Sequence, residues 1–344
     1  MYKSLRKYIF KISPEAAHHL IARTLKMSRF IPFFKRLMRL FFCYRDKSLE
    51  REVLGIKFKN PVGMAAGFDK NGELVNELAC FGFGFIEVGS VTPLPQPGNP
   101  QPRIFRLPLD GAMINRMGMN NSGAKTVALN LRRYSRWRRV PIGGNISKNT
   151  GTFNCHAPID YERCFALMYD QVNYFAVNVS CPNVSNLTQL QDRDILEQII
   201  DRLVNLRHYH DEYKPILLKL SPDLDYEQID EVIDLARSKG VDGIIAVNTT
   251  LDRDGLKTSA EEVEAIGKGG LSGAPLTRLA IEKIRYIHEK TEGGLTIIGV
   301  GGIMTPDDAV NMLNAGASLI QIYTGFIYNG PAFVRQILKR LAKR

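Results

Sequence analysis

From residue 60 onward, short apolar runs rich in β-branched and aromatic residues alternate with longer amphipathic stretches. The pattern predicts eight strands, at Val62–Ala66, Phe83–Val88, Pro141–Asn145, Tyr174–Val179, Pro215–Leu220, Gly243–Asn248, Thr296–Val300 and Ser318–Tyr323. It predicts eight helices after them, near residues 72–80, 122–133, 158–169, 192–210, 226–239, 277–290, 306–314 and 331–342. This α/β alternation favours a (β/α)8 TIM barrel over a doubly wound open sheet, which rarely holds so many units.

The first 47 residues follow a different pattern. Ser13-Pro14-Glu15 is a typical helix start, and the apolar stripe after it predicts a helix over residues 14–27. A second helix is predicted over residues 31–42, where apolar and aromatic positions are interleaved with Lys35, Arg36 and Arg39. Such a helix either lies in a membrane interface or packs as a cap on the main domain. We therefore expect a helical extension over residues 1–47 and a barrel over residues 48–344.

Charge separates the same two regions. Residues 1–47 contain twelve Lys or Arg and two acidic residues, so they carry +10 of the net charge of +11. A nearly neutral barrel does not look like a nucleic-acid channel, and we expect no nucleic-acid partner. No apolar run is long enough for a spanning helix, and no signal peptide is visible. The five cysteines form no CxxC pair and no histidine has metal-ligand spacing, so reduced thiols and no metal site are expected.

The stretch Thr92–Met119 contains six prolines and matches neither a strand nor a helix. We expect a long loop there, above the mouth of the barrel after its second strand. Loops of this length in compact domains are usually functional.

Polar or glycine residues follow all eight predicted strands. Because the working residues of a TIM barrel stand at the carboxyl ends of its strands, these positions should converge. They include five asparagines, one of them from the long loop: Asn115, Asn145, Asn178, Asn183 and Asn248. Neutral amides of this kind suit a planar ring with alternating donors and acceptors, such as a pyrimidine.

The glycine-rich segments after the last two strands predict a phosphate site. They are Gly299-Val-Gly-Gly-Ile303 and Tyr323-Thr-Gly-Phe326, which supply exposed backbone N–H groups where barrels bind phosphate. Two tight turns are the structural alternative. Lys70 and Lys219 also fall near the mouth, where one lysine could stabilise a reduced flavin and the other a substrate carboxylate. Either one alone could be a surface lysine.

Several motifs in order resemble dihydroorotate dehydrogenase. They are Pro61-Val-Gly-Met-Ala-Ala-Gly-Phe-Asp-Lys70, Ile114-Asn-Arg-Met-Gly-Met-Asn-Asn121, Asn178-Val-Ser-Cys-Pro-Asn183, Asn248-Thr-Thr250 and Ile298-Gly-Val-Gly-Gly302. The resemblance runs from about residue 10 to the end. It implies FMN as cofactor and the oxidation of (S)-dihydroorotate to orotate, a step of UMP synthesis.

The resemblance also implies ligand contacts for individual residues. Those implied for the substrate are Lys70, Asn115, Arg116, Met117, Gly118, Met119, Asn178, Asn183, Asn248 and Thr249. Those implied for FMN are Ala65, Ala66, Gly67, Ser90, Asn145, Asn178, Lys219, Val247, Gly273, Gly302, Tyr323 and Thr324.

Cys181 stands where the family has its general base. In the implied reaction the base removes the C5 proton while the C6 hydride passes to flavin. A thiol close to a cation can act as a base, although most free cysteines are only buried small residues. Replacing Cys181 with Ala should slow flavin reduction by about 10²–10⁴-fold, whereas Cys181→Ser should stay active at high pH.

The family divides by electron acceptor. Residues 1–47 resemble the extension of the quinone-linked class, which forms a quinone tunnel and attaches to the membrane. Residues 92–98 and 103–106 also resemble that class, whereas its usual base is Ser and the soluble classes have Cys. We expect membrane quinone as acceptor and a peripheral position on the cytoplasmic side of the cell membrane. Alternatives are a soluble fumarate- or NAD-linked enzyme, a flavin-dependent tRNA dihydrouridine synthase, or a binding module without activity.

Overall fold

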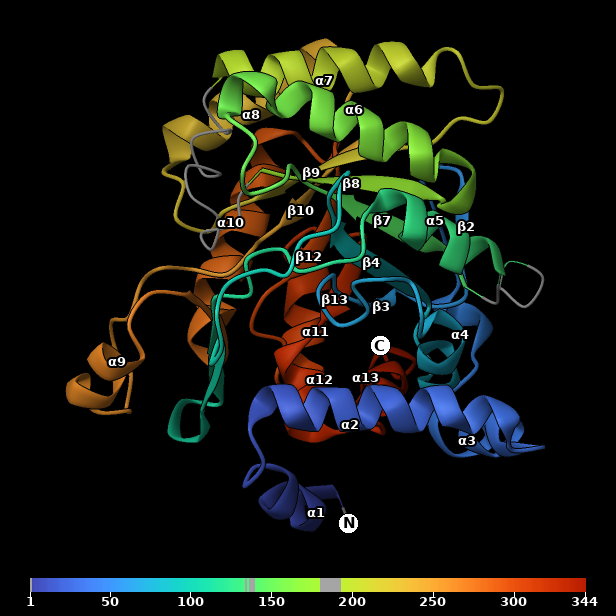
Figure 1. Cartoon of the computed structure of the whole chain (residues 1–344), viewed down its shortest axis with the longest axis vertical. Coiled ribbons are helices and arrows are strands. Elements are labelled where there is room, and N and C mark those ends of the chain that lie inside the picture. The colour runs from blue at the N-terminus through green and yellow to red at the C-terminus, as the bar shows by residue number, and fades with distance from the viewer. Residues whose placement is uncertain (1, 134, 136–139, 180–192) are drawn as a thin grey trace.

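Eight parallel strands close into a barrel at the centre of the computed structural model, which describes residues 2–133, 135, 140–179 and 193–344 (Figure 1). In chain order they are β3 (Val62–Met64), β4 (Phe85–Val91), β7 (Ile142–Ile146), β8 (Tyr174–Asn178), β9 (Ile216–Leu220), β10 (Gly243–Ala246), β12 (Thr296–Val300) and β13 (Leu319–Ile322). The barrel closes where Ile320 of β13 lies opposite Val62 of β3. Each of the eight barrel strands lies within or overlaps a predicted strand, so the predicted TIM barrel is confirmed.

A helix follows each barrel strand and packs on the outside of the barrel. These helices are α4 (Val75–Leu78), α5 (Ala124–Arg133), α6 (Ala157–Met168), α7 (Arg193–Arg207), α8 (Tyr226–Lys239), α10 (Thr277–Lys290), α11 (Pro306–Asn314) and α13 (Phe333–Leu341). A short helix, α12 (Thr324–Asn329), precedes α13. Reciprocal capping boxes start α8, between Asp225 and Gln228, and α11, between Thr305 and Asp308.

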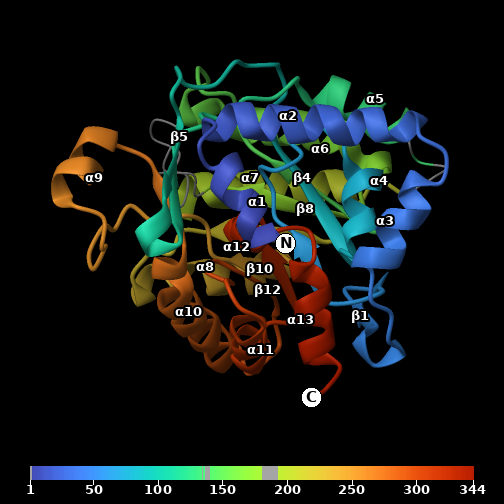
Figure 2. The same ribbon diagram turned by 90° about the horizontal axis from the view of Figure 1, so that it is seen from below.

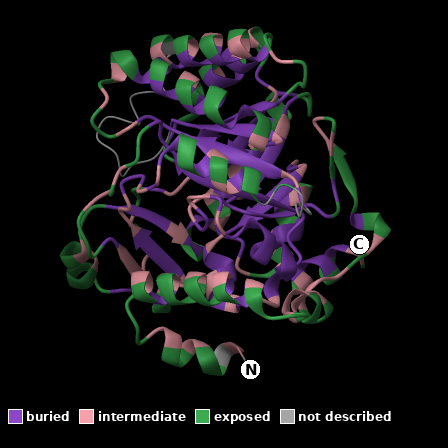
Figure 3. Cartoon of the chain, turned by 45° about the vertical axis from the view of Figure 1, so that its right-hand side comes forward, coloured by how far each residue is buried: buried purple, intermediate pink, exposed green. Residues whose placement is uncertain are grey.

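The core has two parts. The larger one lies between the barrel and its helices, and the smaller one fills the inside of the barrel with residues such as Phe85, Tyr174, Leu217 and Ile298. Figure 3 shows this buried centre surrounded by helices that are exposed on their outer faces. Because strand side chains alternate between the two faces, the interior positions nearer the carboxyl ends of the strands form the floor of the mouth.

A three-stranded antiparallel sheet stands beside the mouth of the barrel. Its strands are β5 (Ile104–Leu107), β6 (Ala112–Asn115) and β11 (Gly270–Gly273), with β6 in the middle. The prediction of a structureless loop over residues 92–119 was therefore wrong. The prolines stand outside both strands, and β6 is stabilised by pairing with β11, for example Ile114 opposite Leu271. Local pattern could not reveal a partner so distant in the chain.

The extension consists of α1 (Tyr2–Ile9), α2 (Pro14–Met27) and α3 (Phe34–Phe42). The first predicted helix matches α2, which Ser13 caps. The second begins three residues later than expected, because Ser28–Phe30 forms a 3-10 turn and Phe33 adopts a left-handed φ of 63°. Helix α1, the hairpin of β1 (Arg51–Val53) and β2 (Ile56–Phe58), and the protruding α9 (Ala260–Ile266) were not predicted (Figures 1 and 2).

The extension contacts the last two helices of the barrel domain. The Tyr2 hydroxyl donates to the Ile327 carbonyl at 2.6 Å, and Arg6 donates to the Tyr328 carbonyl at 2.9 Å, which holds α1 on α12 (Figure 2). Arg335 of α13 donates to the Phe41 carbonyl of α3 at 2.6 Å. None of the helices in the described part of the chain is both long and apolar enough to span a bilayer.

Candidate active site

A cavity opens at the carboxyl ends of the barrel strands, under the three-stranded sheet. It contains about 1160 Å³ of empty space, counting the part open to solvent. Eighteen of the residues predicted to bind substrate or cofactor line it: Ala65, Ala66, Gly67, Lys70, Ser90, Asn115, Met117, Gly118, Met119, Asn178, Lys219, Val247, Asn248, Thr249, Gly273, Gly302, Tyr323 and Thr324. Gly301 of the predicted phosphate segment lines it beside them.

Amide and hydroxyl groups from neighbouring strands are joined across the cavity floor. The Asn178 amide donates to the Ser90 hydroxyl at 2.8 Å, and the Asn248 amide donates to Asn178 at 3.3 Å. Asn145 does not line the cavity. It lies fully buried behind Ser90, whose hydroxyl donates to it. Three of the predicted asparagines thus meet at one place, and the orientation of each is fixed by another.

A buried acid lies beneath this floor. The Glu87 carboxylate on β4 is fully buried and lies 3.7 Å from the Lys219 ammonium, which lines the cavity. Tyr174 and Gln321 donate to the same carboxylate at 3.1 and 2.6 Å. Burial, and then the Glu87 charge, raise the pKa of Tyr174 well above its ordinary value, so this phenol stays a donor. Glu87 and Gln321 were not predicted, although each is a polar residue between two apolar neighbours on its strand.

The side of the cavity near β12 and β13 is formed by backbone and small side chains. Gly302 has a φ of 72°, and a Cβ there would lie 2.4 Å from the backbone of Thr277, so no other residue fits. Thr324 shares a 2.8 Å hydrogen bond with Ser272 of β11, and burial raises the pKa of Tyr323 to about 12. This is the corner at which a phosphate was predicted.

The opposite wall comes from the loop around β6. Met117, Gly118 and Met119 line the cavity, and Gly118 and Met119 turn the backbone with φ values of 69° and 55°. Asn115 donates to the Gly270 carbonyl at 3.4 Å, so the three-stranded sheet holds it in place. Lys70 enters from the loop after β3 and donates to the Asn120 side chain. Ile104, Met113 and Leu276 add apolar surface that was not predicted.

Besides Asn145, three predicted residues are not placed in the cavity. Arg116 follows β6, but its guanidinium donates to the Lys268 carbonyl at 3.0 Å and lies over the Phe105 ring, outside the lining. Cys181 and Asn183 lie outside the described residues. The chain just before them is anchored, because Tyr161 donates to the Asn178 carbonyl at 2.7 Å.

A second cavity lies between α2 and the loop after β3. It shares Gly67, Lys70, Ile104, Met117 and Tyr323 with the first one. His18 of α2 lines it and contacts the Phe68 ring at a centroid distance of 5.2 Å. Burial, and then the neighbouring His19, lower the pKa of His18 to about 4, so its imidazole is neutral at pH 7. The side chain of Arg103 lines the same cavity and pairs with Glu15 at 2.8 Å.

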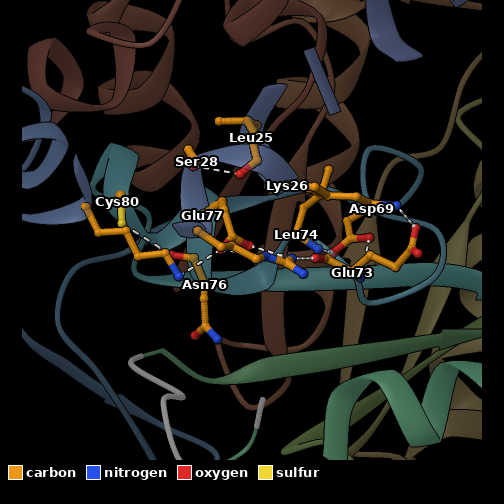
Figure 4. Close-up of polar contacts among 11 residues, drawn as sticks. Leu25, Lys26, Ser28, Asp69, Glu73, Leu74, Asn76, Glu77 and Cys80 are labelled. Carbon is orange, nitrogen blue, oxygen red and sulfur yellow. Dashed lines mark hydrogen bonds and ion pairs between the residues drawn. The ribbon is translucent and has the colours of Figure 1, made fainter. Parts of the chain in front are cut away.

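Polar contacts fix the loop that the two cavities share (Figure 4). Lys26 of α2 forms a 2.6 Å ion pair with Glu73. Asp69 accepts backbone hydrogen bonds from Glu73 at 2.9 Å and Leu74 at 2.7 Å, and its burial raises its pKa to about 6. Because Asp69 directly precedes Lys70, the extension helps to hold the loop from which Lys70 enters the cavity.

Comparison with known proteins identifies the family. Residues 48–344 match the family model described as dihydroorotate dehydrogenase. A protein from Christiangramia forsetii named dihydroorotate dehydrogenase (quinone) is 48% identical over 345 residues, which is 100% of this chain and 99% of that protein. One of the same name from Roseiflexus sp. is 45% identical, over 100% of this chain and 94% of its own length.

Solved structures agree with these sequence matches. The crystal structure of the Eimeria tenella enzyme in complex with ferulenol has a TM-score of 0.87 and 34% identity, and the alignment covers 96% of this chain and 91% of that one. The ligand-free form of the same enzyme gives the same score and identity. The chain therefore belongs to the dihydroorotate dehydrogenase family.

Proposed function

We propose that this protein oxidises (S)-dihydroorotate to orotate with FMN and passes the electrons to a membrane quinone, as a step of UMP synthesis. The observation that carries the proposal is the cavity at the strand ends, where Lys70, Lys219 and three linked polar side chains meet beside a glycine-lined corner. The full-length relatives named as quinone enzymes support the choice of acceptor. Membership of the family argues against a tRNA dihydrouridine synthase and against a module without activity.

The chemistry of the lining fits FMN. Apolar residues such as Ala66, Val247 and Val300 offer flat surface for a ring system, and the Lys219 ammonium offers charge at its edge. The Gln321 Oε1 atom is buried without a hydrogen-bond partner among the described residues, in a side chain that lines the cavity. Gly273, Gly302, Tyr323 and Thr324 would hold the phosphate. When bound, FMN accepts the C6 hydride and delivers the electrons to the acceptor.

The remaining polar lining would hold the pyrimidine ring. Asn115, Asn178 and Asn248 present neutral amides with fixed neighbours, and the Lys70 ammonium suits the substrate carboxylate. Cys181 is the proposed base that removes the C5 proton. Asn183 follows it in the motif as a further substrate contact. Replacing Cys181 with Ala should leave FMN bound but slow its reduction by dihydroorotate.

The second cavity is the proposed route of the quinone. Its five shared lining residues connect it to the first cavity, and it lies under α2 of the extension. A neutral His18 and the Arg103 guanidinium both offer N–H donors for a quinone carbonyl oxygen. A soluble acceptor such as NAD would not need apolar helices around the entrance of the cavity through which it reaches the flavin.

The test is oxidation of dihydroorotate by the full-length protein with different acceptors. The purified protein should be yellow, and dihydroorotate should bleach the flavin absorbance under anaerobic conditions. Turnover with a short-chain quinone, and not with fumarate or NAD, is the expected result. Turnover with fumarate or NAD alone would show that the enzyme belongs to a soluble class, as Cys181 indicates. The resemblance of the extension to the quinone-linked class would then be misleading. Absence of flavin reduction by dihydroorotate would refute the whole proposal.

The outer faces of the extension suit a peripheral position on the cytoplasmic side of the cell membrane. Large apolar side chains are exposed on it, among them Tyr8, Phe30, Phe33, Leu40 and Phe41. Basic residues alternate with them, as in helices that lie in the interface of an anionic bilayer. Helix α3 packs on the core through the half-buried Met38 and Phe42, so the exposed Leu40 and Phe41 are free to contact a lipid surface.

Sedimentation with vesicles tests this position. The protein should bind vesicles of phosphatidylcholine and phosphatidylglycerol more strongly than pure phosphatidylcholine, and salt should weaken the binding. Leu40→Glu should release it. The matched control is Leu109→Glu, because Leu109 is comparably exposed (69% against 73%) but lies in the turn before β6. Equal binding of both variants would contradict the proposal.

A further inference from the structure

A layer of polar side chains lies inside the barrel, directly below the cavity floor. Side chains two positions apart on a strand face the same side. The interior residues Phe85, Leu217 and Leu319 are therefore followed, toward the mouth, by Glu87, Lys219 and Gln321. The interior layers of TIM barrels are usually filled by branched apolar residues. A polar layer here needs a reason other than packing.

Glu87 is the centre of this layer. Its Oε1 atom accepts from the Asn145 amide at 2.8 Å and lies 3.7 Å from the Lys219 ammonium. Its Oε2 atom accepts from the Tyr174 hydroxyl and from the Gln321 amide. The four partners come from four different strands: β7, β9, β8 and β13. A fully buried carboxylate is tolerated only when its oxygens are satisfied in this way.

One charged group of this layer, the Lys219 ammonium, reaches the cavity. Of the residues that the structure describes, Lys70 and Lys219 are the charged side chains that line it. Lys219 is 6% exposed, and Glu87 is the acid that pairs with it. A buried ion pair seldom adds stability over apolar residues of the same volume. The pair is therefore better explained by the ligand above it than by the fold.

We propose that Glu87 is a positioning residue for the flavin, which acts through Lys219. The inference rests on the proposed function, in which the Lys219 ammonium would lie at the edge of the bound flavin ring. Glu87 holds the side chains of Lys219 and Asn145 in place. Its negative charge also offsets part of the positive charge that the Lys219 ammonium presents to the cavity. Reduced flavin carries more negative charge than oxidised flavin, so Lys219 favours the reduced form. Glu87 limits this preference and so sets the midpoint potential.

The test is the midpoint potential of bound FMN in Glu87→Gln, together with the affinity of the apoprotein for oxidised FMN. The variant keeps the size of the side chain and removes its charge, and it replaces one of the two acceptor oxygens by an amide N–H donor. We expect reduced FMN to gain at least about tenfold in affinity relative to oxidised FMN, which is a shift of about 30 mV to more positive potential for a two-electron couple. A potential equal to that of the wild type overturns the inference.

Two comparisons separate charge from other effects. Tyr174→Phe removes one neutral hydrogen bond to Glu87 and should leave the potential unchanged. In a Lys219→Met background, Glu87→Gln should cause a clearly smaller shift, because the part of its effect that passes through Lys219 is absent. A full shift without Lys219 would contradict the inference. If Glu87→Gln alone does not fold, the double variant, which has no unpaired buried charge, should fold. Its failure would show that Glu87 is needed independently of Lys219.

These outcomes are distinct from a failure of the proposed function. Reduction of the wild-type flavin by dihydroorotate tests the function, whereas the potentials are measured by equilibration with a reference dye and need no substrate. A wild-type protein that binds FMN but does not oxidise dihydroorotate leaves the test of Glu87 intact.

Discussion

Two titratable side chains near the second cavity respond to pH in opposite directions. The pKa of Asp69 is about 6 in the folded protein, above its unfolded value of about 4, so its contribution to stability is lost as the pH rises from 4 to 6. The pKa of His18 is about 4 in the folded protein, below its unfolded value of about 6.5, so its contribution is lost as the pH falls from 6.5 to 4. Between pH 4 and 6 the two effects offset each other.

Single substitutions should reveal this opposition. Asp69→Asn should make the free energy of unfolding rise more steeply with pH between 4 and 6 than in the wild type. His18→Gln should make it fall with pH over the same interval. Urea unfolding at saturating FMN measures both, since bound cofactor otherwise shifts the apparent stability. Parallel pH profiles for the three proteins would mean that neither group is buried as described.

Two glycines with the same backbone angle differ only in their surroundings. Gly302 and Gly255 both have a φ of 72°, but a Cβ on Gly302 would lie 2.4 Å from Thr277, whereas one on Gly255 meets nothing within 4 Å. Both alanine variants therefore carry the strain of a left-handed residue, about 1–2 kcal/mol. Gly302→Ala should lose a further 1–3 kcal/mol, roughly the cost of overpacking, and bind FMN at least tenfold more weakly. Fluorescence titration with FMN would refute this if both variants bound it equally.

At the scale of elements, one acid joins the extension to the first barrel helix. Glu77 of α4, labelled in Figure 4, accepts from Arg29 at 2.9 Å and from Lys35 at 2.8 Å, and its side chain is 2% exposed. Two cations from the turn before α3 and from α3 itself thus meet one buried carboxylate. Breaking a buried pair costs far more than breaking an exposed one, because the remaining charges lose their partner.

Glu77→Gln should therefore lower the free energy of unfolding by about 3–5 kcal/mol. It should also speed proteolysis between α2 and the hairpin of β1 and β2. The control is Asp307→Asn, which removes the partner of Arg340 in an exposed pair and should cost roughly 1 kcal/mol or less. Equal destabilisation of the two variants, measured by urea unfolding, would argue against the role of Glu77.

The elements that the sequence predicted well are those whose own residues carry a clear hydrophobic pattern. The apolar stripe of α2 and the runs of the eight barrel strands carry their signal locally. The strands β5, β6 and β11 have four residues each and are stabilised by pairing with one another. The pairing of β6 with β11 joins residues more than 150 positions apart. Helices α1 and α9 are also short. Such elements depend on tertiary contacts that no local pattern contains.

For the whole molecule, the barrel rule explains why so much of the site was predictable. It brings the residues after every strand to one end, and the cavity lies there. The rule says nothing about the layer below, so Glu87 and Gln321 were missed, although a carboxylate within Phe85–Val91 is unusual for a buried strand. Arg116 was predicted as a substrate contact because it belongs to a family motif, but its side chain donates to the Lys268 carbonyl of the neighbouring loop.

The contacts of α1 and α3 have a consequence for the order of events during synthesis. Tyr2 contacts a residue 325 positions later, and Phe41 one that is 294 positions later. At roughly 5–20 residues per second, the extension leaves the ribosome some tens of seconds before its docking surface on α12 and α13 exists. During that interval its aromatic and basic side chains have no intramolecular partner at that surface. A nascent chain in this state is suited to meet a lipid surface, or a chaperone, before its barrel has closed.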